Sequence, residues 1–282
     1  MDPQPRPPAT VGDDAAARRA DDPFDPALDL RLERPVRIFA FDIDGCLAPV
    51  GHGSYDLPTL ARIQEVAREA DHDPSVPKPT FVTGRPQPYV DALLQMLHAS
   101  LPASFENGAG LCTRHPYRSW FVPEVEAGRP ELERAERLLH THDDLTLQLG
   151  KSASFSVFAV DPVALPVPAL AERLSAWRRE HGVALEVDPS SDCVNLLLPG
   201  IGKGRGLTAL VEETGVPESA IAGIGDSIGD VGWLRRCAVS FAPSGAVPEA
   251  RAAVTHPSGL PDARASLAAY LALVRANRAL GA

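Results

Sequence analysis

Short apolar runs alternate with amphipathic stretches in two separate parts of the chain, and this alternation limits the possible fold more than any other feature. The first part predicts strands at 36–41, at 79–83 and from residue 103, with helices at 57–70 and 87–98. The second part, from residue 199, predicts helices at 203–214, 228–236 and 261–279 and strands at 220–224 and 238–241. Alternating strands and helices form a parallel sheet covered on both faces. The sequence therefore predicts an α/β fold with a Rossmann-like parallel sheet as its core.

The middle of the chain has a different pattern. It predicts strands at 117–122, 145–149, 153–160, 183–187 and 192–198, and helices at 130–142 and 166–181. Strands grouped around helices in this way indicate an α+β module. We therefore predict a discontinuous core, residues 35–112 and 199–282, with an α+β cap domain inserted at 113–198.

The first 34 residues are rich in proline, aspartate, arginine and alanine and poor in large apolar side chains. Such a segment buries too little surface to offset the entropy of ordering it. We expect residues 1–34 to form a disordered tail, in which 25–32 is the stretch able to lie against the body as a short element.

Charge and composition exclude several classes of partner. The net charge is −10 in a chain of 282 residues, whereas nucleic-acid-binding domains are usually basic. No apolar run approaches the length of about 18 residues that crosses a membrane.

The four cysteines, at 46, 112, 193 and 237, form no C-x-x-C pair, which argues against a zinc ribbon and fits a reducing compartment. Without an apolar signal core, the expected location is the cytoplasm. We expect no nucleic-acid or membrane partner, and the oligomeric state has no signal in the sequence.

The first predicted strand ends in two acids, Asp42 and Asp44. Ligands of an open α/β sheet bind just outside the carboxyl ends of its strands. Like charges buried at such a place are costly, so they need a cation or a chemical role. A solvated turn with a helix cap is the alternative interpretation.

The second predicted strand ends in Thr83, Gly84 and Arg85. A hydroxyl, a glycine amide and a guanidinium suit an anion such as phosphate. A strand-to-helix turn capped by Thr83 is the alternative, and it is the commoner meaning of such a stretch taken alone.

Lys203 begins the first helix of the second part, in a chain with three lysines against 24 arginines. This bias hints that a compact point charge is needed there. A phosphate-binding P-loop is excluded, because Leu197 stands where that motif requires glycine and Gly204 where it requires serine or threonine.

Asp226 and Asp230 follow the predicted strand at 220–224. The stretch superficially resembles a dinucleotide-binding loop, but Asp226 would repel a pyrophosphate. A Mg²⁺ site explains it better, since Mg²⁺ prefers carboxylate oxygens and keeps water and phosphate as its other ligands. Two helix-capping acids are the alternative.

The order of acid pair, threonine, lysine and acid pair resembles the haloacid dehalogenase (HAD) superfamily of phosphohydrolases. The matching stretches lie within 36–112 and 199–256 and are 42–46, 82–85, Lys203 and 225–230. The insert resembles the larger, α+β cap of that superfamily, and Glu-Asn-Gly-Ala at 106–109 is similar to its Cof-type and sugar-phosphatase branch. Two positions depart from the pattern: Cys46 replaces a frequent threonine, and Gly229 an asparagine common in that branch.

The resemblance implies a phosphomonoester hydrolase that forms an aspartyl-phosphate on Asp42. Asp44 would protonate the leaving oxygen and then take a proton from water. Thr83 and the Gly84 amide would hold phosphate oxygens, and Lys203 would neutralise the acids and the developing charge.

The resemblance also implies a Mg²⁺ cofactor. Asp42, Asp226 and the backbone carbonyl of Asp44 would hold the ion, with Asp230 as a supporting acid of the metal site. Arg85 would bind the substrate phosphate or brace the loop.

The expected partner is a small phosphorylated metabolite, such as a sugar phosphate or phosphoglycolate. The insert would close over the site and set specificity, with Arg114, Arg118, Lys151, Ser152 and Asn195 as candidates. A phosphomutase of the same superfamily and a catalytically silent phosphate-binding protein are the alternatives. A response-regulator receiver is disfavoured, because receivers are shorter and lack an inserted module.

Overall fold

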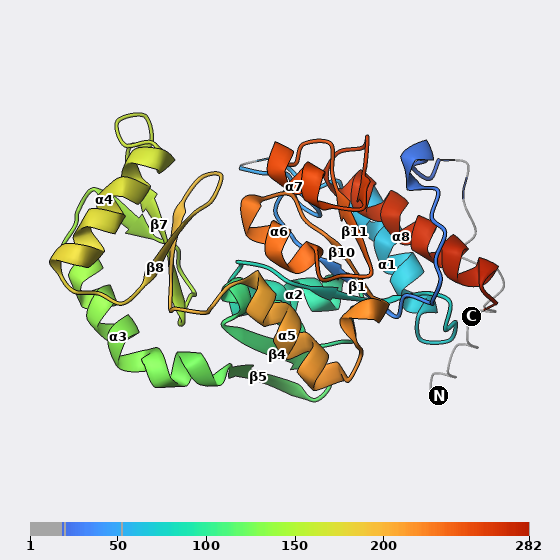
Figure 1. Cartoon of the computed structure of the whole chain (residues 1–282), viewed down its shortest axis with the longest axis horizontal. Helices are drawn as coiled ribbons and strands as arrows, with labels where there is room; N and C mark the ends of the chain where they lie inside the picture. Colours follow the sequence, from blue (N-terminus) through green and yellow to red (C-terminus); the bar gives the residue numbers. More distant parts are fainter. Residues whose placement is uncertain (1–18, 20, 52, 282) are drawn as a thin grey trace, which may run out of the picture.

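The computed structural model describes residues 19, 21–51 and 53–281. This part of the chain forms two layered bodies (Figure 1). One is built on a parallel sheet, and the other is an α+β body formed by the middle of the chain. The predicted fold, a parallel α/β core with an inserted α+β module, is confirmed. Among the described residues, no helix is both long enough and apolar enough to cross a membrane.

The larger body is built on a five-stranded sheet in which every neighbouring pair is parallel. Its spatial order is β12 (His256–Pro257), β11 (Val239–Ala242), β10 (Ile221–Ile224), β1 (Ile38–Phe41) and β2 (Lys78–Phe81). From β1 the chain moves to β2 on one side, and it later returns to β10 on the other side. This change of direction opens a crevice at the carboxyl ends of β1 and β10, the place where ligands of such sheets bind.

Helices cover both faces of this sheet. They are α1 (Leu57–Glu69), α2 (Gln87–Met96), α5 (Lys203–Thr214), α6 (Ile228–Leu234), α7 (Pro248–Ala253) and α8 (Asp262–Ala279). Alternate side chains of β1 face opposite layers: Ile38 and Ala40 pack with α5 and α6, whereas Phe39 and Phe41 pack with α1 and α8. Burial on both faces explains why this strand is a continuous apolar run rather than an alternating one.

Helix α8 is fastened to the start of β1 by one buried amide. The side chain of Asn277 accepts from the backbone nitrogen of Val36 (2.9 Å) and donates to the carbonyls of Val36 (2.8 Å) and Ser75 (2.9 Å). The Tyr270 hydroxyl of the same helix donates to the carbonyl of Pro77 (2.6 Å). The last helix thus satisfies backbone groups at the amino ends of β1 and β2, which the sheet leaves without partners.

A small antiparallel sheet extends the larger body. It consists of β3 (Ala103–Phe105), β4 (Gly110–Arg114) and β5 (Tyr117–Phe121), and it contacts α2 and α5. The sequence predicted only β3 and β5 of these strands. β3 meets the parallel sheet through a single bridge between Val82 and Ser104, so residue 103 begins a second sheet instead of continuing the first.

The inserted body is a four-stranded antiparallel sheet covered by two helices. Its strands, in spatial order, are β6 (Leu145–Leu147), β7 (Ser154–Ala159), β9 (Val194–Leu197) and β8 (Glu186–Pro189), and its helices are α3 (Pro123–Leu139) and α4 (Val167–Glu180). Helix α3 begins at Pro123, seven residues before the predicted start, and Pro130 lies within it on the exposed surface. A buried cluster that includes Leu132, Leu174, Trp177 and Leu196 gives this body its own core.

The predicted disordered tail needs a correction for its second half. Residues 1–18 and 20 lie outside the described residues, but the segment 21–34 packs on the larger body. The guanidinium of Arg62 binds the carboxylate of Asp22 at 2.9 Å, and both side chains are buried. Asp25 accepts hydrogen bonds from the Ser258 hydroxyl (2.6 Å) and the Gly259 amide (2.7 Å). These polar contacts, together with Leu28, which is buried in the core, and Leu30 and Leu32, which pack against it, order the segment.

We expect Asn277→Ala to lower the free energy of unfolding by about 2–4 kcal/mol, because it leaves one amide and two carbonyls buried without partners. Urea denaturation measures the change. Gln95→Ala, at an exposed position of α2, is the control and should change stability by less than about 0.5 kcal/mol. Equal effects of the two substitutions would contradict the role given to Asn277.

Candidate active site

Two acids lie at the crevice between β1 and β10. Asp42 directly follows β1, and its backbone nitrogen donates to the carbonyl of Ile224 at the end of β10 (2.9 Å). Asp226 lies two residues beyond the end of β10. The parallel pairing of the two strands therefore brings together acids that are far apart in sequence.

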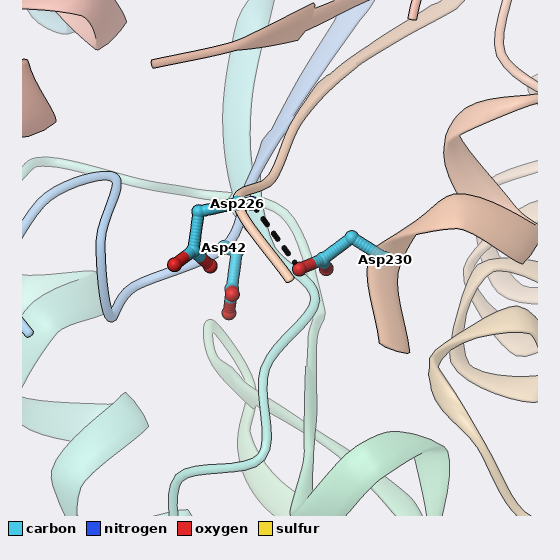
Figure 2. A group of neighbouring side chains, drawn as sticks. All are labelled: Asp42, Asp226 and Asp230. Atoms are coloured by element: carbon cyan, nitrogen blue, oxygen red, sulfur yellow. Dashed lines mark hydrogen bonds between the residues drawn. The ribbon is translucent and has the colours of Figure 1, made fainter. Parts of the chain in front are cut away.

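A third acid, Asp230, joins them from α6. Ligand oxygens of Asp42, Asp226 and Asp230 all lie within 4.8 Å of one another. Figure 2 shows the carboxylates of Asp42 and Asp226 beside each other, with Asp230 reaching in from its helix. Asp226 and Asp230, which are four residues apart in the sequence, thus belong to one cluster with Asp42.

Asp230 is fully engaged by hydrogen bonds. Its Oδ2 accepts from the backbone nitrogen (3.0 Å) and the hydroxyl (2.5 Å) of Ser227 and, more weakly, from the nitrogen of Asp226 (3.3 Å). Its Oδ1 accepts from Trp233 Nε1 (2.8 Å) and Lys203 Nζ (2.7 Å). The interactions with Ser227 form a capping box at the start of α6. Asp230 therefore caps helix α6, as the alternative interpretation of the sequence expected, and it is also a member of the acid cluster.

Lys203 lies between the acids. Its ammonium donates to Asp42 Oδ2 (2.7 Å) and Asp230 Oδ1 (2.7 Å), and the side chain is 9% exposed. The position depends on close packing of α5 against the loop after β3: a Cβ on Gly108 would lie 2.3 Å from the Gly202 carbonyl oxygen. Glycines around Lys203 therefore let its helix approach closely enough for the ammonium to reach both carboxylates.

Burial and mutual repulsion set the charges in this cluster. Burial raises the pKa of Asp42 well above its ordinary value, and Lys203 offsets only part of that effect. Burial and the charge of Asp230 raise the pKa of Asp226 to about 7. Burial alone would raise the pKa of Asp230 also, but Lys203 and the hydrogen bonds lower it. Three acids against one ammonium leave an excess of negative charge that a cation would neutralise.

The donor set fits a magnesium ion. Lys203 Nζ donates a hydrogen bond to Oδ2 of Asp42. Within the described structure, Oδ1 of Asp42 and the Asp226 carboxylate accept no hydrogen bond from another side chain. These are the oxygens best placed to bind a divalent cation, whereas both oxygens of Asp230 already accept two or more hydrogen bonds. Gly45 has a φ of +73°, and a Cβ there would lie 2.2 Å from Asp226 Oδ2, so this position requires glycine.

Asp44 points elsewhere. Its carboxylate binds Arg85 through two hydrogen bonds, of 2.8 and 2.5 Å, and it is not one of the three clustered carboxylates. The guanidinium also lies 4.8 Å from the centroid of the Tyr89 ring. The structure therefore pairs two residues for which the sequence predicted separate roles, and the Arg85 side chain braces Asp44 at the pocket wall.

The second strand end is only partly accessible. Thr83 is fully buried, and its hydroxyl accepts from the Arg85 amide (3.2 Å). Gly84 and Arg85 line the pocket, together with Asn107. The Asn107 amide lies against Gly84, and among the described atoms its buried Nδ2 has no hydrogen-bond acceptor. Asn107 was missed as a site residue, although the Glu-Asn-Gly-Ala stretch that contains it was noticed.

The pocket has walls from both bodies. The core contributes Asp42, Asp44, Val50, Gly51, Gly84, Arg85, Asn107, Lys203, Asp226, Ser227 and Gly229. The inserted body contributes Gln148, Lys151, Ser156, Phe158, Asp188, Pro189, Ser190, Ser191, Asp192, Cys193 and Asn195. Of the five specificity candidates, Lys151 and Asn195 line this pocket. Arg114 instead pairs with Asp91 (2.9 Å), Arg118 pairs with Glu213, and the backbone nitrogen of Ser152 donates to Glu106.

Sequence comparison finds no protein-family model that matches the chain, and no curated protein matches it. Comparison of structures gives several similar folds. A protein of Thermoplasma acidophilum aligns with a TM-score of 0.66 at 17% identity, over 86% of this chain and 100% of the other. A haloacid dehalogenase-like hydrolase from Bacteroides thetaiotaomicron aligns with a TM-score of 0.60 at 17% identity, over 84% and 98% of the two chains.

A sucrose-phosphatase from Synechocystis, solved with sucrose and phosphate, aligns with a TM-score of 0.62 at 17% identity, over 85% of this chain and 98% of its own. Identities this low establish the fold and leave the activity to be argued from the site. Nearly the whole of each relative is matched, so the likeness covers both the parallel core and the inserted body. The chain therefore has the fold of the haloacid dehalogenase-type hydrolases, with an α+β cap inserted in a Rossmann-like core.

Proposed function

We propose that this chain is a Mg²⁺-dependent phosphomonoester hydrolase acting on a small phosphorylated metabolite. The observation that carries the proposal is the arrangement at the end of β1. Asp42 has one oxygen held by Lys203, and Asp44 lies at the wall of the same pocket. A nucleophile, an acid–base group and a cation are the parts that covalent phosphoryl transfer needs. The likeness to a sucrose-phosphatase supports a phosphorylated small molecule as the substrate.

In the first step, an Asp42 oxygen attacks phosphorus, and the bond from phosphorus to the ester oxygen breaks. Asp44, in its protonated form and released from Arg85, donates its proton to the leaving oxygen, which departs as an alcohol. In the second step, water attacks the aspartyl-phosphate, Asp44 takes the proton of that water, and the bond to Asp42 breaks to release inorganic phosphate.

Several groups of the chain stabilise the charge of this reaction. Lys203 holds Asp42 in place and offsets the negative charge that gathers at phosphorus. Gly84 and Asn107 line the pocket, and the backbone amide of Gly84 is a donor for phosphate oxygens. A magnesium ion held by Asp42 and Asp226 would supply Lewis-acid stabilisation of the phosphate. Asp230 keeps Lys203 and the start of α6 in position.

Asp42→Asn should lower phosphate release at least about 1,000-fold, because the amide is a poor nucleophile and the covalent route is lost. The measurement is inorganic phosphate release across a panel of phosphorylated metabolites, with Mg²⁺ or with chelator. Asp143→Asn, at an exposed loop position after α3, is the matched control and should keep the native rate. A folded native chain that releases no phosphate from any ester would refute the hydrolase and favour a mutase or a silent binding protein.

Magnesium should raise the melting temperature of the native protein, because it binds the folded state and neutralises buried carboxylates. At about 100 times the dissociation constant, the gain is about 2.7 kcal/mol. Asp226→Asn should lose this gain, while its melting temperature in chelator should equal or exceed that of the native chain, since one repelling carboxylate is gone. The same magnesium shift in Asp226→Asn and in the Asp143→Asn control would show that the ion binds elsewhere.

Magnesium affinity should depend on pH. The pKa of Asp226 in the folded state is about 7, above the ordinary value of 3.8, so the metal-free folded state binds this proton more tightly than the unfolded state does. Its contribution to stability is therefore lost as pH rises from about 4 to about 7. Magnesium competes with that proton, so its affinity should rise over this range and level off above it. Calorimetric titration at several pH values tests this, and a flat profile below pH 7 would contradict it.

A further inference from the structure

Lys151 is a cation in the inserted body that the proposed reaction does not use. It lines the same pocket as Asp42 and Lys203. Its ammonium donates to the Ser156 hydroxyl (2.5 Å), and in the part of the chain that the structure describes, no carboxylate lies at ion-pair distance from it. Burial lowers the pKa of Lys151 to about 8, although the charge of the Glu106 carboxylate offsets part of that effect. A mostly buried ammonium whose direct partner is neutral is costly unless a further negative group reaches it.

The loop that carries Lys151 is fixed to the core. The Glu106 carboxylate, in the loop after β3, is 1% exposed and accepts from the backbone nitrogens of Ser152 (3.0 Å) and Ala153 (2.8 Å) and from the Ser154 hydroxyl (3.1 Å). These bonds hold the residues directly after Lys151 against the catalytic body. The ammonium is therefore positioned relative to the phosphate site and does not move freely with the inserted body.

The partners of Lys151 leave donors available. The Ser156 hydroxyl gives its own proton to Asn195 Oδ1 (2.6 Å) and accepts from Lys151 through a lone pair. An ammonium has three N–H groups, so two remain for a ligand in the pocket. Ser156 and Asn195 are neutral groups of this wall, as are Gln148, Ser190 and Ser191, and a polyol could be bound by such groups without a buried charge.

Lys151 lies in the same pocket as Asp44 and Arg85. It is close enough to Asp44 and Arg85 that their charges alter its pKa, and Asp44 is the group that protonates the leaving oxygen. Acids of the insert also line this pocket: Asp188, whose pKa is raised by burial, and Asp192. Asp192, and Asp188 when it is ionised, would repel a negative ligand placed beside them, so an anionic group would be bound close to Lys151.

We propose that Lys151 binds a second anionic group, carried by the alcohol portion of the substrate, so that the preferred substrates are phosphate monoesters of hydroxy acids. This inference rests on the proposed phosphatase function and names the class of ester. A single ammonium with a neutral hydroxyl beside it matches a carboxylate, which needs one point charge, better than a second phosphate, which usually takes several donors or an arginine.

The test uses two esters with the same carbon skeleton. 3-Phosphoglycerate has a carboxylate where glycerol 3-phosphate has a hydroxymethyl group. The native enzyme should prefer 3-phosphoglycerate at least about tenfold in kcat/KM. In Lys151→Met the ratio should fall to about one, mainly through a higher KM for the acid, and Lys151→Arg should recover part of the preference. Lys78→Met, which removes an exposed lysine of β2, should leave the ratio unchanged.

Fructose 1,6-bisphosphate and fructose 6-phosphate form a second pair, in which the additional anion is a phosphate. A preference for the bisphosphate that Lys151→Met removes would support the second-anion site and assign it to phosphate. Equal native rates for the members of both pairs, or equal losses on both in Lys151→Met, would overturn the inference.

p-Nitrophenyl phosphate separates the two possible failures. Its hydrolysis by a native enzyme that shows no preference for anionic esters would overturn the inference and leave the phosphatase intact. Absence of hydrolysis with every ester would refute the phosphatase, and the inference would fail with it.

Discussion

The ammonium of Lys203, held between Asp42 and Asp230, is the interaction on which the site depends. Its two hydrogen bonds of 2.7 Å join residues separated by 161 and 27 positions in the sequence. Carboxylate oxygens of the three acids lie within 4.8 Å of one another, so the acids repel one another. The positive charge of Lys203 lowers the pKa of Asp230 and keeps this acid ionised. The lysine also lies at the first turn of α5, where the helix dipole disfavours a cation. The carboxylates must outweigh that cost, so the lysine and the acids require each other.

The position of Lys203 depends on glycines that let helix α5 pack closely against the loop after β3. Helix α5 approaches the loop after β3 so closely that a Cβ on Gly206 would lie 2.3 Å from the Ser104 hydroxyl oxygen. Similarly, Gly45 leaves room for the Asp226 carboxylate beside the loop after β1. A larger side chain at either position would move an element that carries a charged group. The precision of the cluster therefore depends on residues that take no part in its chemistry.

The sequence predicted the elements whose signal is local. The strand at β1, the amphipathic helices and the polar strand ends all follow from periodicity and from the position of acids after apolar runs. The signals it lacked are tertiary. Strand β4 pairs with β3 and β5 and packs against α2 and α5, and the segment around Asp22 is held by an arginine 40 residues away. Likewise, nothing local indicated that Asp44 would pair with Arg85, since that contact joins two different strand ends.

Glu106 joins the two bodies of the protein beside the pocket. Its φ of +47° is unusual for a residue with a side chain, and burial raises its pKa despite the hydrogen bonds from the inserted body. A buried carboxylate in such a place contributes little net stability, because the bonds must first offset its desolvation. Its value is positional: opening the pocket would expose the carboxylate and release the loop that carries Lys151. The position of Lys151 is therefore coupled, through one side chain, to the loop of the core that contains Asn107.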